Sequence, residues 1–179
     1  MRIIAGSRKG ARIYAPRGRE TRPTGDRVRE ALFNLVGPVD GMDVLDLYAG
    51  SGALGLEALS RGADSATFVD SDRAAARTIN RNLDTLGLAA ARVYVDDTAR
   101  RLAADAARGR RYDLVLIDPP YRELAGVLPV LAPHLEAVLA AGGLVVVESD
   151  AREEPELPLP LRTTRRYGST RITVFEAPA

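Results

Sequence analysis

Acidic, glycine and proline residues follow apolar runs at several points of this chain, so the ends of buried strands would bring them together. The first such group is Asp46 with the small-residue loop Ala49-Gly50-Ser51-Gly52. The apolar run 42–47 before the loop predicts a buried strand, and the periodic apolar segment 54–59 after it predicts a helix. A glycine loop between a strand and a helix lets backbone N–H groups approach a ligand at a helix N-terminus.

The spacing Gly50-x-Gly52-x-x-Gly55 also matches the dinucleotide-binding fingerprint, so neighbouring residues must decide the ligand. Asp46 lies four residues before Gly50, where a carboxylate would repel a pyrophosphate. It would suit a cofactor that carries positive charge, as S-adenosylmethionine does. Alternatively, Asp46 serves only as a cap that accepts backbone N–H bonds from the loop.

The second group, Asp118-Pro119-Pro120-Tyr121, directly follows the apolar run 114–117. Open α/β sheets bind ligands at the carboxyl ends of their strands, so this tetrad should face the glycine loop. The prolines leave rigid carbonyl acceptors, Asp118 adds a carboxylate, and Tyr121 offers a flat face for stacking. These groups suit an exocyclic amino group on a planar base, whose nitrogen would attack a methyl sulfonium. The structural alternative is a plain strand-to-loop turn.

Two further positions predict contacts with a nucleoside cofactor. Asp70 ends the predicted strand 65–70, where a carboxylate can accept both ribose hydroxyls. Asp97 and Thr98 follow the predicted strand 92–96. They would either bond the adenine amine or cap the next helix, and the sequence leaves both roles open.

Positive charge is concentrated at the N-terminus, although the net charge of the 179 residues is only +1. Residues 1–29 hold nine basic and two acidic side chains, which predicts a polyanionic partner. With no cysteine and a single histidine, we expect no metal site. No apolar run is long enough for a membrane span and no signal-peptide core is present, so the expected location is the cytoplasm.

From residue 41 onward, strand and helix patterns alternate. We expect strands at 43–48, 65–70, 92–96, 112–117 and 143–149, and helices at 73–86, 99–107 and 128–139, with Pro129 and Pro133 confining the last helix to its later turns. Strands 161–167 and 170–175 should form a closing antiparallel hairpin. Before residue 41 we expect a small β-hairpin or bent ribbon with its basic tip at 6–10 and a helix capped by Thr24. The fold class is α/β, a doubly wound sheet with helices on both faces, preceded by a basic extension over 1–40.

Taken together, these motifs resemble those of class I S-adenosylmethionine-dependent methyltransferases that act on amino nitrogens. Segments 1–6, 22–30 and 47–62 further resemble the bacterial 16S rRNA guanine-N2 methyltransferases of the RsmD type, over nearly the whole chain. That resemblance implies a mostly parallel seven-stranded Rossmann-like sheet in a methyltransferase domain over 41–179. It also implies a guanine in 16S rRNA of a partly assembled 30S subunit as substrate. We expect a monomer. Family members commonly carry Glu where Asp70 stands.

Under this interpretation the basic extension would bind RNA phosphates, and we expect Arg8, Lys9 and Arg12 to make those contacts. Arg27 would contact the cofactor carboxylate, RNA or only solvent. Three alternatives for the whole protein stay open. The first is a methyltransferase for another amino group, such as adenine N6 in DNA or RNA or a protein glutamine. The second is a non-catalytic ribosome-assembly binder. The third is a nicotinamide oxidoreductase, which the carboxylate of Asp46 opposes.

Overall fold

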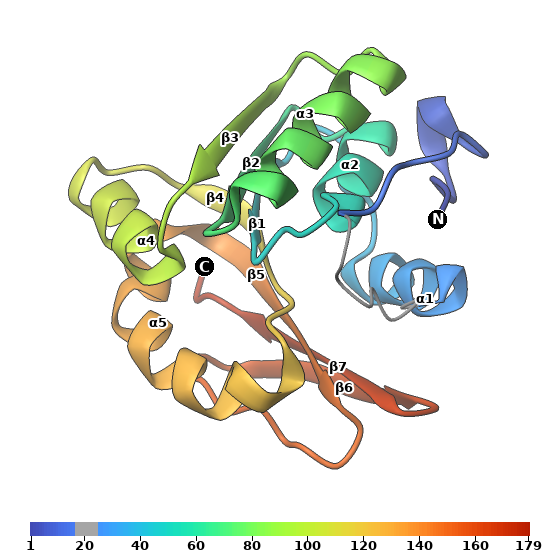
Figure 1. Ribbon diagram of the computed structural model, residues 1–179. Helices are drawn as coiled ribbons and strands as arrows, with labels where there is room; N and C mark the ends of the chain where they lie inside the picture. Colours follow the sequence, from blue (N-terminus) through green and yellow to red (C-terminus); the bar gives the residue numbers. More distant parts are fainter. Residues whose placement is uncertain (17–24) are drawn as a thin grey trace.

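The computed structural model describes residues 1–16 and 25–179, with only the backbone described at Tyr121. Its strands are β1 Asp43–Leu47, β2 Ser65–Asp70, β3 Ala91–Val95, β4 Tyr112–Ile117, β5 Leu139–Asp150, β6 Leu161–Tyr167 and β7 Thr170–Glu176. They form one sheet in the order β3-β2-β1-β4-β5-β7-β6 (Figure 1). β1 to β5 are parallel, and β7 is antiparallel to both of its neighbours.

Helices cover both faces of this sheet. In the described residues they are α1 Asp26–Val36, α2 Ala53–Ser60, α3 Arg73–Leu86, α4 Thr98–Ala107 and α5 Leu124–Val138, with short 3-10 helices η1 Gly6–Arg8 and η2 Tyr121–Glu123. α1, α2 and α3 lie on one face, and α4 and α5 lie on the other (Figure 1). The doubly wound α/β fold expected from the sequence is therefore confirmed.

Alternating side chains of the central strands supply one hydrophobic core on each face. In β1, Val44 belongs to the core under α1, α2 and α3, whereas Leu45 and Leu47 belong to the core under α4 and α5. Because side chains alternate with a period of two, Asp46 lies on the same face as Val44. β4 alternates in the same way, with Leu116 on the α1–α3 face and Ile117 on the α4–α5 face.

The direction of winding reverses between β1 and β4. β2 and β3 follow on one side of β1, while β4 and β5 lie on its other side. The carboxyl end of the sheet, marked by Leu47, Asp70 and Ile117, is where a fold of this kind binds its ligand.

The N-terminal segment is a short, bent antiparallel ribbon. Its arms are joined by the isolated bridge between Arg2 and Arg12 and by the bonds from the N–H of Ile3 to Ala11 (2.9 Å) and from the N–H of Ile13 to Met1 (3.2 Å), and η1 lies in the expected tip. Gly6 has a φ of +79°, and a Cβ there would lie 1.7 Å from the carbonyl oxygen of Ser60. The tip of the ribbon is thus packed closely against the end of α2. Thr24, the expected cap of the first helix, lies outside the described residues, and α1 follows Gly25.

α5 is longer than the expected helix 128–139, and it contains both Pro129 and Pro133. Each proline lacks the N–H that would bond the carbonyl one turn earlier. Both prolines are exposed, so the carbonyls left without a partner can reach water. The opposite side of α5 is held in the core by a row of leucines, namely Leu124, Leu128, Leu131 and Leu135.

A buried carboxylate in α2 fastens the N-terminal segment to the body. The side chain of Glu57 is 0% exposed, and it accepts the backbone N–H groups of Ile4 (2.8 Å) and Ala5 (2.9 Å). It also accepts a bond from Nε of Arg61 at 2.8 Å. The N-terminal segment therefore supplies hydrogen bonds to the buried carboxylate of Glu57, whose burial without partners would be unfavourable.

Arg29 in α1 is the cationic partner of this network. It is 1% exposed, and its Nε lies 3.7 Å from Oε2 of Glu57. Its guanidinium also donates to the carbonyl of Arg2 and to Oδ1 of Asp26. The buried pair thus joins α1, α2 and the N-terminal segment.

Replacing Glu57 with glutamine should lower the free energy of unfolding by about 3 kcal/mol, because it leaves the buried Arg29 beside a neutral group. Urea unfolding followed by circular dichroism measures the change. Glu136→Gln, at an exposed position of α5, is the matched control and should shift the value by less than about 0.5 kcal/mol. Similar small shifts in both variants would contradict the anchoring role of Glu57.

Candidate active site

Four carboxylates gather at the carboxyl end of the sheet, where four neighbouring strands finish. Asp46 and Asp70 lie in β1 and β2, Asp118 directly follows β4, and Glu148 lies near the end of β5. β4 is paired with β1 on one side and β5 on the other, and continuing its register places Asp118 beside Glu148. Three of these four carboxylates were predicted from the sequence, and the fold brings them together as expected.

Two of the carboxylates hold the glycine loop at both ends. Oδ2 of Asp46 accepts the N–H of Gly55 at 2.9 Å, and Oδ2 of Asp70 accepts the N–H of Gly50 at 2.9 Å. Oδ1 of Asp70 also accepts the N–H of Asp72 at 2.8 Å. Asp46 therefore makes the capping bond considered as its alternative role, and a carboxylate keeps further acceptor sites for a ligand.

The interior of the loop is fixed as well. Ala49 donates its N–H to the carbonyl of Val69 (3.1 Å), and Gly52 donates to the carbonyl of Ala49 (2.7 Å). Asn82 of α3 donates to the carbonyl of Ser51 at 3.0 Å. The loop is thus held in one shape before any ligand binds, which reduces the ordering cost of binding.

The third glycine of the Gly50-x-Gly52-x-x-Gly55 spacing, Gly55, is explained by packing and does not require a bound dinucleotide. A Cβ at Gly55 would lie 2.4 Å from Cε1 of Phe68 in β2 and 3.2 Å from Oδ2 of Asp46. Only glycine lets the first turn of α2 approach β2 this closely. The glycine is required by packing of the helix against the sheet, whichever cofactor binds.

Burial makes the carboxylates costly to ionise. It raises the pKa of Asp46 to about 7, while the bond from Gly55 lowers that pKa and the charge of Asp70 raises it. The pKa of Asp118 is raised well above its ordinary value by burial, and then by the charges of Glu148 and Asp46. Such a cluster favours the approach of a cation, whose charge would compensate the buried carboxylates.

Glu148 is a site residue that the sequence interpretation missed. It is 2% exposed, and its charge acts on Asp118. A signal was present, because Glu148 follows the apolar run 144–147 just as Asp118 follows the run 114–117. A charged residue at the end of a buried strand is informative even without a flanking motif.

Tyr48 is a second residue that was missed. Its φ is +61°, a conformation that is costly for a residue with a side chain and that is often retained at functional sites. The hydroxyl of Thr98 bonds the hydroxyl of Tyr48 at 2.6 Å, which ties the start of the glycine loop to α4. Asp97 accepts the N–H of Arg100 at 2.8 Å and so caps α4, the second of the two roles considered for it.

The proline tetrad turns the chain from β4 into α5. Pro119 is buried and Pro120 is exposed. The carbonyl of Pro120 accepts the N–H of Glu123 at 2.8 Å, which closes the turn that contains η2. The Pro119 carbonyl is then the backbone acceptor next to Asp118. The side chain of Tyr121 lies outside what the structure describes.

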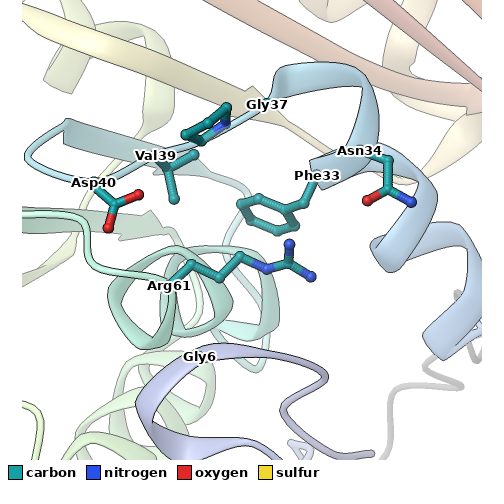
Figure 2. Close-up of a pocket in the computed structure, with 8 residues that line it drawn as sticks. Gly6, Phe33, Asn34, Gly37, Val39, Asp40 and Arg61 are labelled. Atoms are coloured by element: carbon teal, nitrogen blue, oxygen red, sulfur yellow. The ribbon is translucent and has the colours of Figure 1, made fainter.

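A cavity of about 370 Å³ lies at the opposite, amino end of the sheet (Figure 2). Phe33, Asp40 and Arg61 line it, and all three belong to segments that lead into β1 or β2. The guanidinium of Arg61 lies 4.6 Å from the centroid of the Phe33 ring, and its Nε bonds Glu57. This cavity therefore lies beside the residues that hold the N-terminal segment, and it is separate from the four carboxylates at the carboxyl end of the sheet.

The residues predicted to bind RNA are spread along the N-terminal part of the chain. Arg8 donates to the carbonyl of Leu86 at the end of α3, and exposed Lys9 follows it. α3 runs back from the carboxyl end of the sheet, so its last turn lies at the amino end, away from Asp118. Arg12 and Arg27 are also exposed.

Over the described ranges, no helix is long and apolar enough to cross a membrane. In the same residues, no three His, Cys, Asp or Glu side chains are grouped so as to hold a metal ion.

The sheet is doubly wound, and four carboxylates and a glycine loop lie at the point where its winding reverses. These features define a Rossmann-like methyltransferase fold. Comparison with known proteins then gives the particular family. The chain belongs to the family described as "Conserved hypothetical protein 95", whose sequence model matches residues 1–176.

Relatives of this chain carry methyltransferase names. "Putative rRNA methyltransferase YlbH" of Bacillus subtilis (strain 168) is 43% identical over 183 residues, which cover 98% of each chain. "Ribosomal RNA small subunit methyltransferase D" of Escherichia coli (strain K12) is 43% identical over 153 residues, 84% of this chain and 75% of that one. A solved structure, "Putative methyltransferase yhhF from Escherichia coli", is similar with a TM-score of 0.86 and 37% identity, over 100% of this chain and 98% of that one.

Asp46→Asn should make the free protein more stable at pH 8. The pKa of Asp46 rises from 3.8 to about 7 on folding, so between these values the folded state holds a proton that the unfolded state has lost. Raising the pH through this range therefore destabilises the wild type. Asparagine still accepts the Gly55 N–H but has no charge to bury.

Urea unfolding at pH 5 and pH 8 measures this effect, with Asp64→Asn at an exposed position as the control. The wild type and the control should lose more stability between the two pH values than Asp46→Asn does. Equal losses in all three proteins would show that Asp46 does not have the raised pKa.

Proposed function

We propose that this protein transfers the methyl group of S-adenosylmethionine to the exocyclic N2 amine of a guanine in 16S rRNA. The observation that carries the proposal is the position of Asp118-Pro119-Pro120-Tyr121, directly after β4 and beside the glycine loop that follows β1. This arrangement combines a place for a cationic cofactor with acceptors for a base amine.

The residues of the glycine loop fit such a cofactor. Asp46 is a buried carboxylate with a pKa near neutrality, so a cation beside it would offset the cost of its ionisation. Ala49, Gly50, Ser51 and Gly52 supply the closely approaching backbone.

The nucleoside half of the cofactor is assigned to the ends of β2 and β3. Asp70, which also accepts the N–H groups of Gly50 and Asp72, would accept the ribose hydroxyls. Asp97 and Thr98 would lie beside the adenine. Asp97 keeps its cap bond to α4 in this arrangement.

S-adenosylmethionine supplies an electrophilic methyl group on a sulfonium. Asp118 and the Pro119 carbonyl would accept the two N–H bonds of the base amine and orient the nitrogen lone pair toward that methyl group. Tyr121 would stack on the base. Burial raises the pKa of Asp118, so in its ionised form this carboxylate is a basic acceptor, which would stabilise the positive charge that the nitrogen gains in the transition state. The proton that the methylated nitrogen releases can pass to the same carboxylate.

The relatives support ribosomal RNA as the substrate class. The E. coli relative at 43% identity is named as a small-subunit rRNA methyltransferase, and the B. subtilis relative is named as an rRNA methyltransferase. A guanine amine inside a helix is inaccessible, so the base must be flipped out or splayed from its neighbours. We therefore assign a partly assembled 30S subunit as the substrate, and a cytoplasmic monomer as the active form.

We assign residues 1–40 to RNA binding, with Lys9 and Arg12 as the phosphate contacts. Arg8 donates its Nε–H to the carbonyl of Leu86 at the end of α3, so only its other N–H groups would bind a phosphate. Arg27, in the first turn of α1, is an additional candidate for RNA or for the cofactor carboxylate.

Asp118→Ala should lower kcat for methyl transfer to rRNA about 100-fold or more, because the base amine loses its charged acceptor. The dissociation constant for S-adenosylmethionine, measured by calorimetry, should change little. Asp64→Ala, at an exposed position, is the control and should match the wild type in both measurements. Wild-type turnover in Asp118→Ala would refute the mechanism, and complete loss of cofactor binding would move Asp118 into the cofactor site.

A further inference from the structure

The C-terminal hairpin brings a second set of arginines to the carboxyl end of the sheet. β6 is an outer strand that runs parallel to β5, because β7 between them is antiparallel to both. The end of β6, with Arg165 and Arg166, therefore lies at the same end of the sheet as Asp118. Arg162, near the start of the strand, lies toward the amino end.

The strand register places Arg165 in one row with the proposed acceptor of the base. Glu148 pairs with Ile172, and Ile172 pairs with Arg165. Ile117 pairs with Val147, so the next residue, Asp118, lies level with Glu148. Three steps between strands separate Asp118 from Arg165, a backbone distance of about 14 Å.

The two residues also share a face of the sheet. Ile172, opposite Arg165, belongs to the core under α1, α2 and α3, and Tyr167, two residues beyond Arg165, packs against the same core. Asp118 follows Ile117 of the other core, so its side chain lies on the α1–α3 face, together with Asp46 and Glu148. Arg166, one residue on, must lie on the opposite face of β6.

Arg165 has no acidic partner among the residues that the structure describes. Its side chain is exposed and donates only to the carbonyl of Thr164, the preceding residue. In contrast, Arg162 pairs with Glu176 at 3.7 Å, and Arg171 pairs with Glu154 at 3.2 Å. Arg165 thus presents an uncompensated charge near the site, whereas Arg162 and Arg171 are each paired with an acid.

We infer that Arg165 binds an RNA phosphate next to the target nucleotide, so that the end of β6 forms a second RNA contact in addition to the N-terminal extension. The inference rests on the proposed rRNA substrate. A guanidinium at this distance suits the backbone of a nucleotide that flanks a base inserted at Asp118, because phosphates are the groups that position a nucleic acid on a protein. Arginine also binds phosphate in a bidentate manner.

Charge on an outer strand has a second explanation, which is protection against pairing with other chains. That function would be served by a charge anywhere along β6 and on either face. RNA binding requires the charge at the carboxyl end and on the face of Asp118. The three exposed arginines of the strand therefore separate the two explanations.

The test compares Arg165→Ala with two single-charge controls on the same strand, Arg162→Ala at its other end and Arg166→Ala on its other face. Binding of unmodified 30S particles is measured over a range of salt concentrations, KM and kcat are measured with labelled S-adenosylmethionine, and the oligomeric state is measured by light scattering. Arg165→Ala should raise the KM for particles several-fold, leave kcat unchanged, and reduce the slope of log K against log salt by about 1. Both controls should match the wild type.

An unchanged salt slope and KM for Arg165→Ala would overturn the inference, as would equal effects in all three variants. Self-association of Arg165→Ala with normal RNA binding would assign the residue to protection of the strand instead. Particle binding and transfer of the labelled methyl group are measured separately. If the proposed methylation is wrong, the wild type will transfer no label to the RNA. The salt dependence of binding would still decide the role of Arg165.

Discussion

The structure depends on carboxylates that are buried at the carboxyl end of the sheet. Asp46 and Asp70 hold the glycine loop by accepting N–H groups at its two ends, and Asp118 lies next to Glu148 across β4 and β5. Burial raises the pKa of Asp46 and of Asp118, so the free protein carries an electrostatic cost at neutral pH. A bound cation would offset that cost. We therefore propose that the feature that weakens the free protein also selects a sulfonium cofactor over a pyrophosphate.

A second buried acid organises the opposite side of the molecule. Glu57 and Arg29 hold the N-terminal segment against α1 and α2, while Asn82 bonds both the backbone of Tyr14 and the carbonyl of Ser51. The segment thus lies along the helices that support the glycine loop. Its basic tip is far from Asp118, whereas the end of β6 lies at the same end of the sheet. We propose that both regions bind RNA, with the end of β6 the nearer of the two to Asp118.

Much of the fold followed from the sequence because its signals are local. Apolar runs and helical periodicity located the strands and helices after residue 41, and residues that follow an apolar run lie at the carboxyl end of a parallel sheet. The antiparallel pairing of the N-terminal ribbon was predicted, but β-prone residues do not reveal that Gly6 packs against Ser60. Glu57 and Arg29 were not recognised as a pair, since the contact joins distant segments. Glu148 was missed for the same reason: its role depends on which strand lies beside β4.

The identity of the atom that receives the methyl group decides the proposed function. The most direct measurement incubates the protein and labelled S-adenosylmethionine with unmodified 30S particles, naked 16S rRNA or DNA, and then identifies the labelled nucleoside by mass spectrometry. We expect N2-methylguanosine in the rRNA of the particles. Label in N6-methyladenosine, or no label in any nucleic acid, would contradict it.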